Sequence, residues 1–278
     1  MGLDTFVPSL WAPRLLTPLY KSLVFASVVN RDYEGEIRQF GDSVRINEIG
    51  DITVSDYTKG STLSWQELTS AQKVLYIDKA KSFSFAIDDI DEAQSKPKVM
   101  DEAMARAAYA IADQIDQDIA GLYTSAGITL TATTVTTTNV LSWVADFAEE
   151  LNKNNVPTAG RFLIVPPGIV TKLMLTVSGG VSTDAVPKET ASGQIANGFV
   201  GSVYGFSILM SNNVQESTSG VYQPLALVRS AISWAGQLTS IKPVDREDTF
   251  GQGVKGLYVY GQKVVRPYAL ATCAATIG

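Results

Sequence analysis

The stretch PKVMDEAMARAAYAIADQIDQDIAGL, residues 97–122, carries the strongest helical pattern in the chain. Pro97 suits a first helical turn, and Gly121 and Gly127 mark the end. Roughly twenty-five residues at about 1.5 Å each form a rod of about 37 Å, which is long for a globular protein. One apolar face is predicted from residues that recur every three or four positions, namely Met100, Met104, Ala107, Ile111, Ile115, Ile119 and Leu122.

The acidic residues of this region are expected to lie in water or to cap the helix. Asp113, Asp116 and Asp118 are assigned to a solvated helix face, since no partner residue suggests acid–base work. The acidic run 88–92 has the composition of a hard-cation site but lacks the glycine and ligand spacing of a calcium loop. Because acidic residues stabilise a helix N-terminus, we predict a capping role for this run.

Before the helix, the sequence predicts a long two-stranded ribbon. Residues 43–47 and 51–55 alternate between polar and apolar, as half-buried strands do. After turn-forming residues the chain returns through 73–78 and through alternating apolar positions in 83–87. A ribbon of this kind has little core of its own, so we expect it to lie on another surface.

The N-terminal residues 6–29 are apolar, but three prolines and the charged Arg14 and Lys21 interrupt them. A membrane-spanning helix needs about twenty uninterrupted apolar residues, and a secretory signal begins with a basic region. Neither is predicted here. Two interpretations stay open: the segment docks on its own core, or it is an arm that docks on a neighbour.

After the helix, strands and helices alternate. The middle of the chain, 127–237, is interpreted as a compact α/β lobe inserted between an earlier and a later β portion. Strands are expected at 128–139, 161–165, 199–210, 225–228 and 231–234, helices at 142–152 and 169–175, and long closing strands at 240–244 and 257–265.

Composition and charge exclude several functions. The 278 residues are 45% hydrophobic and 18% charged, which is typical of a folded globular protein. The formal net charge of −6 argues against tight or specific binding of nucleic acid. Histidine is absent and Cys273 is the only cysteine, which excludes Ser-His-Asp and Cys-His catalysis, His-ligated metal sites and internal disulfides.

Residues 251–256, GQGVKG, match the letters of a dinucleotide-binding fingerprint. That fingerprint needs a helix after its glycines, whereas the strand-like LYVY follows here. A glycine-rich turn between two strands is the better interpretation. No catalytic, cofactor-binding or metal-binding residue is predicted.

The order of these parts resembles the α+β fold of tailed-bacteriophage major capsid proteins of the Hong Kong ninety-seven type. The similarity covers nearly the whole chain, and it rests on the ordered set of short stretches 10–16, 41–44, 82–89, 161–167, 198–205, 246–251, 254–257 and 259–261. The resemblance implies an N-arm (1–32), an extended β E-loop (33–82), a P-domain with the spine helix (83–126), an inserted α/β A-domain (127–237) and closing P-domain strands (238–278).

The resemblance also implies a function. The chain would be a shell subunit of a virion and not an enzyme, and would assemble through pentamers and hexamers into an icosahedral capsid. That shell would enclose double-stranded DNA, contacted non-specifically, and would expand on maturation. The implied partners are a separate scaffolding protein, a portal protein at one vertex and a decoration protein, with assembly in the bacterial host cytoplasm and no membrane.

Candidate subunit-interface residues follow from the same resemblance: Phe6, Trp11 and Leu15 in the arm, Asp56 and Lys59 at the loop tip, and Arg246, Glu247 and Asp248 in a P-domain loop. Some family members join an E-loop lysine covalently to a P-domain asparagine. Residues 242–256 contain no asparagine, so no such link is expected. Three alternatives remain: an encapsulin-like compartment, a cytoplasmic nucleotide-binding enzyme and a β-rich adhesin.

Overall fold

The computed structural model describes residues 21, 23–33, 43–49, 52–54, 56, 59–60, 62, 65–67, 70–88, 99–178, 199–245 and 251–278. Asp56 and Lys59 are among them. The other candidate interface residues lie outside the described residues: Phe6, Trp11, Leu15, Arg246, Glu247 and Asp248. Pro97 and positions 89–92 of the acidic run also lie outside the described residues. The place of Pro97 in the first helical turn and the capping role of the acidic run therefore stay predictions.

Helix α3 (Val99–Ala120) is the long helix that the sequence predicts, and it continues into the 3-10 turn η2 (Gly121–Ser125). Its 22 residues span about 33 Å. The C-terminal half is the anchored part, since Ile115, Ile119 and Ala120 are buried there. The described side chains of the N-terminal half are all partly or fully exposed.

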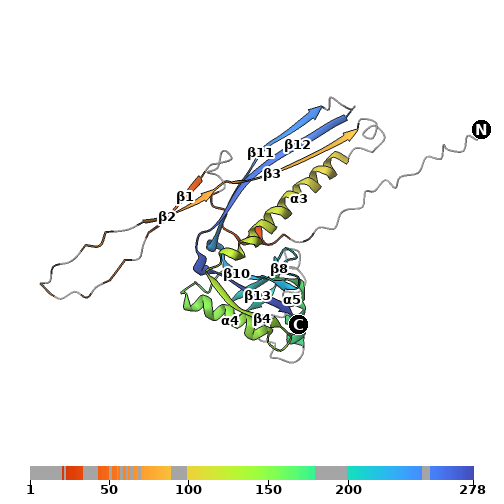
Figure 1. The fold of residues 1–278 in the computed structure, drawn as a ribbon. Coiled ribbons are helices and arrows are strands. Elements are labelled where there is room, and N and C mark those ends of the chain that lie inside the picture. Colours follow the sequence, from red (N-terminus) through yellow and green to blue (C-terminus); the bar gives the residue numbers. More distant parts are fainter. Residues whose placement is uncertain are drawn as a thin grey trace, which may run out of the picture.

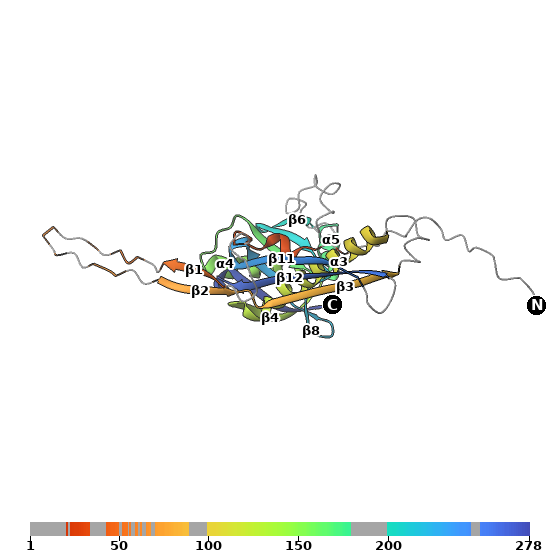
Figure 2. The same ribbon diagram turned by 90° about the horizontal axis from the view of Figure 1, so that it is seen from above.

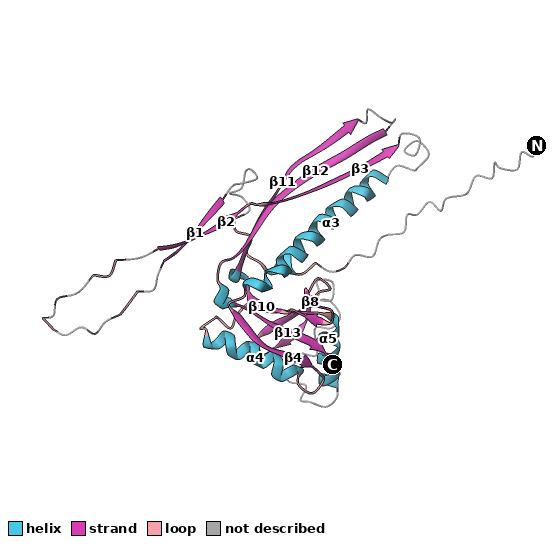
Figure 3. Cartoon of the chain, in the orientation of Figure 1, coloured by secondary structure: helices cyan, strands magenta, loops and turns pink. Residues whose placement is uncertain are grey.

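A three-stranded antiparallel sheet lies alongside α3 (Figure 1), and Figure 3 shows the same arrangement by element type. Its order is β11 (Ile232–Asp245), β12 (Gly251–Val264) and β3 (Lys79–Asp88). β12 is central and pairs on both sides. The sheet therefore joins segments of the chain from before and after the lobe.

The interpretation of residues 251–256 as a turn is wrong, because they form the first part of strand β12. At Gly256 an added Cβ would collide with the ring of Phe83, and at Gly261 with the carbonyl oxygen of Tyr76. Glycine in a strand permits this kind of close approach. These two glycines serve the packing of neighbouring segments on β12.

Strands β1 (Ser43–Ile49) and β2 (Ser70–Tyr76) form the expected antiparallel ribbon, paired over all 7 residues of each strand. The ribbon and the described residues between its strands project away from the body in both views (Figures 1 and 2). Among the described residues of the ribbon, the buried ones lie at its base. A small separate core holds it, made of Val44, Leu75, Ile77, Ala235 and Val259.

The lobe contains an eight-stranded sheet in the order β6-β7-β5-β10-β13-β9-β8, with β4 beside β13. Helices α4 (Val140–Lys153) and α5 (Pro167–Ser178) pack beside it (Figure 1). The 3-10 turns η5 (Arg229–Ala231) and η6 (Pro267–Ala269) connect it to β11 and β12. Its strands are β4 (Ile128–Val135), β5 (Arg161–Val165), β6 (Phe199–Val203), β7 (Phe206–Met210), β8 (Glu216–Thr218), β9 (Val221–Tyr222), β10 (Leu225–Val228) and β13 (Leu270–Ile277).

The sheets divide the chain differently from the expected segments. Assigning all of 238–278 to the closing P-domain strands is wrong for β13, which lies in the lobe between β10 and β4. A strand that is apolar on both faces needs a sheet covered on both faces, and β13 is buried along most of its length. The boundary at 237/238 falls inside β11, and β3 begins at Lys79, before the expected boundary at 82/83.

Replacing Gly261 with alanine is expected to destabilise the protein, because the new methyl group meets the Tyr76 carbonyl at the ribbon base. Overpacking of this kind costs about 1–3 kcal/mol. The loss is measured as a decrease in the free energy of unfolding in urea. Gly121→Ala is the matched control, since no neighbouring atom lies within 4 Å of its added methyl group. Wild-type stability in the Gly261 variant would show that the ribbon base does not rest on β12.

Candidate functional site

A short N-terminal segment, Lys21 and residues 23–33, crosses the foot of α3 and is called the strap below. It contains the one-turn helix α1 (Phe25–Val28), whose Phe25 and Val28 are buried. The backbone N–H of Asn30 donates to the Ile232 carbonyl, and that of Trp234 donates to the Asn30 carbonyl, each at 2.9 Å. The strap is therefore docked on the core of its own chain. Residues 6–20 of the same apolar segment lie outside the described residues, so for them both sequence interpretations stay predictions.

A buried carboxylate joins the strap to α3 and the lobe. Asp116 has 0% exposure, and its Oδ1 accepts a hydrogen bond from the backbone N–H of Ala26 at 3.1 Å. Asn213, in the turn after β7, donates through Nδ2 to Asp116 and to Asp113, each at 2.9 Å. The ammonium group of Lys21 lies 2.8 Å from Asp113. We call Lys21, Ala26, Asp113, Asp116 and Asn213 the strap junction.

Burial raises the pKa of Asp116 above its ordinary value, and the hydrogen bonds from Asn213 and from the Ala26 and Phe25 amides offset part of that rise. The assignment of Asp113, Asp116 and Asp118 to a solvated face is therefore wrong, most clearly for Asp116. Its partners lie 90 and 97 positions away in the sequence. No local sequence pattern predicts contacts between residues that far apart in the chain.

Asp118 ties the three-stranded sheet to the same helix. Its Oδ2 accepts hydrogen bonds from the Tyr260 hydroxyl at 2.5 Å and from Lys79 Nζ at 3.1 Å. Burial opposes ionisation of Asp118, but the bonds from Tyr260 and Lys79 outweigh it, so the pKa of this carboxyl lies below its usual range. Burial and the neighbouring Asp118 carboxylate raise the pKa of Tyr260. Asp118 is thus an ionised carboxylate that accepts hydrogen bonds from the neutral phenol of Tyr260 and the ammonium group of Lys79.

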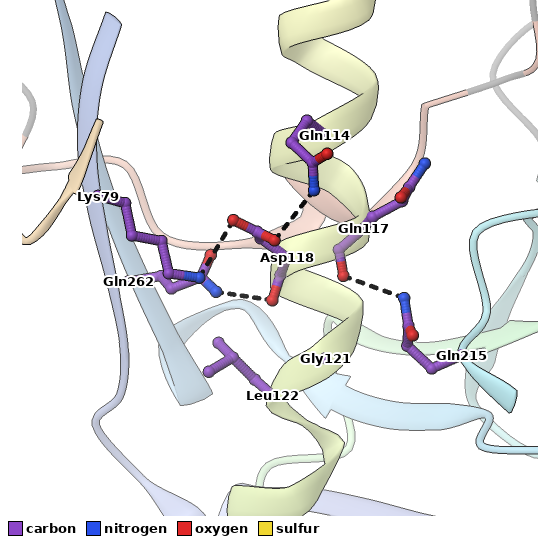
Figure 4. Close-up of a pocket in the computed structure, with 8 residues that line it drawn as sticks. All are labelled: Lys79, Gln114, Gln117, Asp118, Gly121, Leu122, Gln215 and Gln262. Carbon is purple, nitrogen blue, oxygen red and sulfur yellow. Dashed lines mark hydrogen bonds and ion pairs between the residues drawn. The ribbon is translucent and has the colours of Figure 1, made fainter. Parts of the chain in front are cut away.

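A polar pocket of about 410 Å³ opens beside this contact. Figure 4 shows Gln262 donating to the Asp118 carbonyl, at 2.6 Å, and Gln215 donating to the Gln117 carbonyl, at 3.3 Å. These bonds tie β12 and the lobe to α3. The pocket lining is mostly amide, consisting of Lys79, Gln114, Gln117, Asp118, Gly121, Leu122, Gln215 and Gln262.

These groups form a structural contact between elements of the fold. Amides, an ammonium group and a phenol hold the carboxylates, and none of them is an activated nucleophile paired with a base. Among the residues that the structure describes, no three acidic, histidine or cysteine side chains are placed to hold a metal ion. Cys273 is buried in the lobe, and burial raises the pKa of its thiol.

The two described candidate interface residues lie apart from this joint. Asp56 and Lys59 are both exposed in the segment between β1 and β2. The same segment carries apolar side chains that the sequence interpretation did not single out: Ile52, Val54 and Trp65 are 69%, 92% and 92% exposed. The sequence feature that could have found them is their apolar character in the connecting segment of a two-stranded ribbon, where no core is available to bury them.

The family model described as phage capsid protein matches residues 71–273. This chain belongs to the phage capsid protein family. The match includes α3, the three-stranded sheet and nearly all of the lobe. No curated protein matches the chain.

Solved phage structures share the fold of this capsid protein over its whole length. A chain of Mycobacterium phage Che8 is 29% identical, with 98% of each chain covered and a TM-score of 0.77. The capsid structure of Cyanophage P-SCSP1u is 20% identical, with 99% of this chain and 94% of that chain covered and a TM-score of 0.74. The capsid of Ralstonia phage GP4 is 12% identical, with 100% and 98% covered and a TM-score of 0.70.

The expected α+β capsid fold is confirmed, and the function of the chain is that of a major capsid protein. The comparisons give no support to the encapsulin or nucleotide-enzyme alternatives. Within the described part of the capsid protein, no helix has the length and hydropathy needed to span a membrane. The strap junction is accordingly a structural joint in a shell subunit.

Removing the bridging amide with Asn213→Ala is expected to lower the free energy of unfolding by about 1–3 kcal/mol, because two carboxylates lose a shared donor. Asn212→Ala is the matched control from the same turn, since Asn212 is exposed and surface changes stay within about 0.5 kcal/mol. Urea unfolding of the subunit measures both. Equal losses in the two variants would contradict the bridging role.

The raised pKa of Asp116 predicts a pH-dependent stability. Its contribution is fully present below the ordinary value of 3.8 and is lost as the pH rises through the higher folded value. The facing charged groups are Asp113 and Lys21. Asp116→Asn should therefore gain stability relative to wild type as the pH rises from about 4 to about 7.

Unfolding in urea across that pH range measures the difference between the Asp116 variant and wild type. The control is Asn212→Ala, which changes no titratable group at an exposed position, so its difference from wild type should stay constant across the range. A pH-independent difference for the Asp116 variant would contradict the assigned burial of a charged group.

Proposed function

We propose that this capsid protein assembles with copies of itself, through pentamers and hexamers, into a closed icosahedral shell around double-stranded DNA. The β1–β2 ribbon carries the proposal, because it projects from the body and its described buried residues lie at its base (Figure 1). Large exposed apolar side chains mark an interaction surface, and Trp65 and Val54 are each 92% exposed. A neighbouring subunit covers them in the shell.

The candidate interface residues fit the same assembly. Asp56 and Lys59 lie in the described part of the ribbon tip, where they meet a neighbour at the edge of the apolar contact. Exposed ion pairs contribute only about 0–1 kcal/mol each, so apolar burial supplies most of the stability. We propose the remaining contacts at Phe6, Trp11 and Leu15 of the N-arm and at Arg246, Glu247 and Asp248 of the P-domain loop.

The wider set of partners is proposed from family membership. It comprises a separate scaffolding protein, a portal protein at one vertex and a decoration protein, with assembly in the bacterial host cytoplasm. The net charge of −6 suits non-specific contact with packaged DNA, since an acidic wall does not bind phosphate tightly. The role is structural and non-enzymatic, and no lysine–asparagine link is proposed, because residues 242–256 lack asparagine.

Expansion of the shell is proposed to bend α3 and the ribbon. The support is the uneven anchoring of α3, whose C-terminal half is buried and tied to the strap, sheet and lobe. The described side chains of its N-terminal half are partly or fully exposed. Bending on the N-terminal side of Tyr109, whose hydroxyl is hydrogen-bonded to the Lys21 backbone of the strap, leaves the strap junction intact.

Shortening the ribbon tests the proposed function. Replacing residues 50–69 with an Asn-Gly turn removes the exposed tip but keeps the register of Ile49 opposite Ser70. The subunit should keep wild-type unfolding in urea yet form no closed shells in electron micrographs when expressed with its scaffolding protein. Wild type under the same conditions is the control. Normal shells from the shortened chain would remove the ribbon from the assembly mechanism.

A further inference from the structure

An apolar groove of about 360 Å³ runs between α3 and the three-stranded sheet, beside the strap. Met104, Ala108 and Ile111 form the helix side, and Phe83, Trp234 and Tyr258 form the sheet side. The small side chain of Ala108 leaves space between the helix and the sheet. The groove is thus lined mainly by aromatic and aliphatic side chains, with Arg31 among them.

The ribbon carries a side chain of matching chemistry. Trp65 is 92% exposed and lies among described tip residues that are all exposed. An indole ring buries about 150–250 Å² when it enters an apolar pocket, and tryptophan is enriched at the centres of protein interfaces. Among the described residues, the subunit therefore carries both an exposed indole on the ribbon and an apolar groove on the body.

We propose that Trp65 of one subunit inserts into the groove between α3 and the sheet of a second copy. This inference rests on the proposed assembly and specifies the contact within it. The ribbon points away from α3 of its own chain in both views (Figures 1 and 2), so the groove that receives Trp65 belongs to a neighbour.

Charges around the two surfaces favour the same pairing. Arg31 lies at the groove, with its guanidinium 4.9 Å from the centre of the Trp234 ring. Glu67 is exposed two positions after Trp65. With the indole in the groove, Glu67 comes to the rim where Arg31 lies, and opposite charges at the rim set the register of the contact.

Photo-crosslinking tests the contact in assembled shells. Replacing Trp65 with p-benzoylphenylalanine keeps a large aromatic group at the tip, and illumination of purified shells should join subunits covalently. Mass spectrometry should map the link to residues 99–106, the tryptic peptide that contains Met104. The control carries the same group at Tyr204, an exposed turn of the lobe, and should not label this peptide.

Charge reversal tests the register independently. Glu67→Arg and Arg31→Glu should each lower the yield of closed shells by about tenfold, and the double reversal should restore it. Each single variant must first show wild-type unfolding in urea, which separates lost assembly from a misfolded subunit. A double variant as defective as the single ones would overturn the Glu67–Arg31 pairing.

The outcomes separate this inference from the proposed function. Shells that form normally but crosslink from position 65 to peptides outside the groove would overturn the insertion of Trp65 and leave shell assembly standing. Wild-type protein that forms no shells with its scaffolding protein would overturn the proposed function itself. Links to residues 99–106, together with rescue by the double reversal, establish the groove as the receptor.

Discussion

The buried carboxylate of Asp116 is the constraint on which the arrangement of the subunit depends. A charged group without water is stable only when hydrogen-bond donors surround it. Here they come from the strap, through Ala26, and from the lobe, through Asn213. Loss of either contact leaves a buried acid poorly paired. Asp118 then fixes the sheet to the same helix through Tyr260. Strap, lobe and sheet thus share one anchoring point at the foot of α3.

Much of this architecture is visible in the sequence because it depends on local periodicity. The spacing of apolar residues predicts α3, and the alternation over residues 43–47 predicts most of the ribbon strand β1. The short apolar run 161–165 becomes β5 in the middle of the lobe. In each case the residues that form the element also carry the pattern. The order of these elements then points to the capsid fold that the family match confirms.

The parts that sequence reasoning misses depend on distant partners. Asp116 is bonded across 97 positions and Asp118 across 142, so their burial has no local signature. Gly256 looks like a turn residue until Phe83 is placed against it, and nothing local marks Gly261 as the position that the Tyr76 carbonyl approaches. The exposure of Trp65 is likewise hidden, because an apolar residue near a strand is ordinarily assigned to the core. The resemblance alone points to the charged Asp56 and Lys59 of the ribbon tip and does not point to the exposed apolar Val54 and Trp65 in the same segment.

The position of β13 has a consequence for biosynthesis. This strand pairs with β4 and β10, and places Ala271 opposite Ile128. The ribosome delivers β4, β5 and β10 long before β13, so the nascent lobe is an incomplete sheet with unpaired edges. Chains that stop upstream of Leu270 cannot close it. Closure of the lobe sheet therefore waits for the synthesis of β13, although its partners β4 and β10 precede it by many residues.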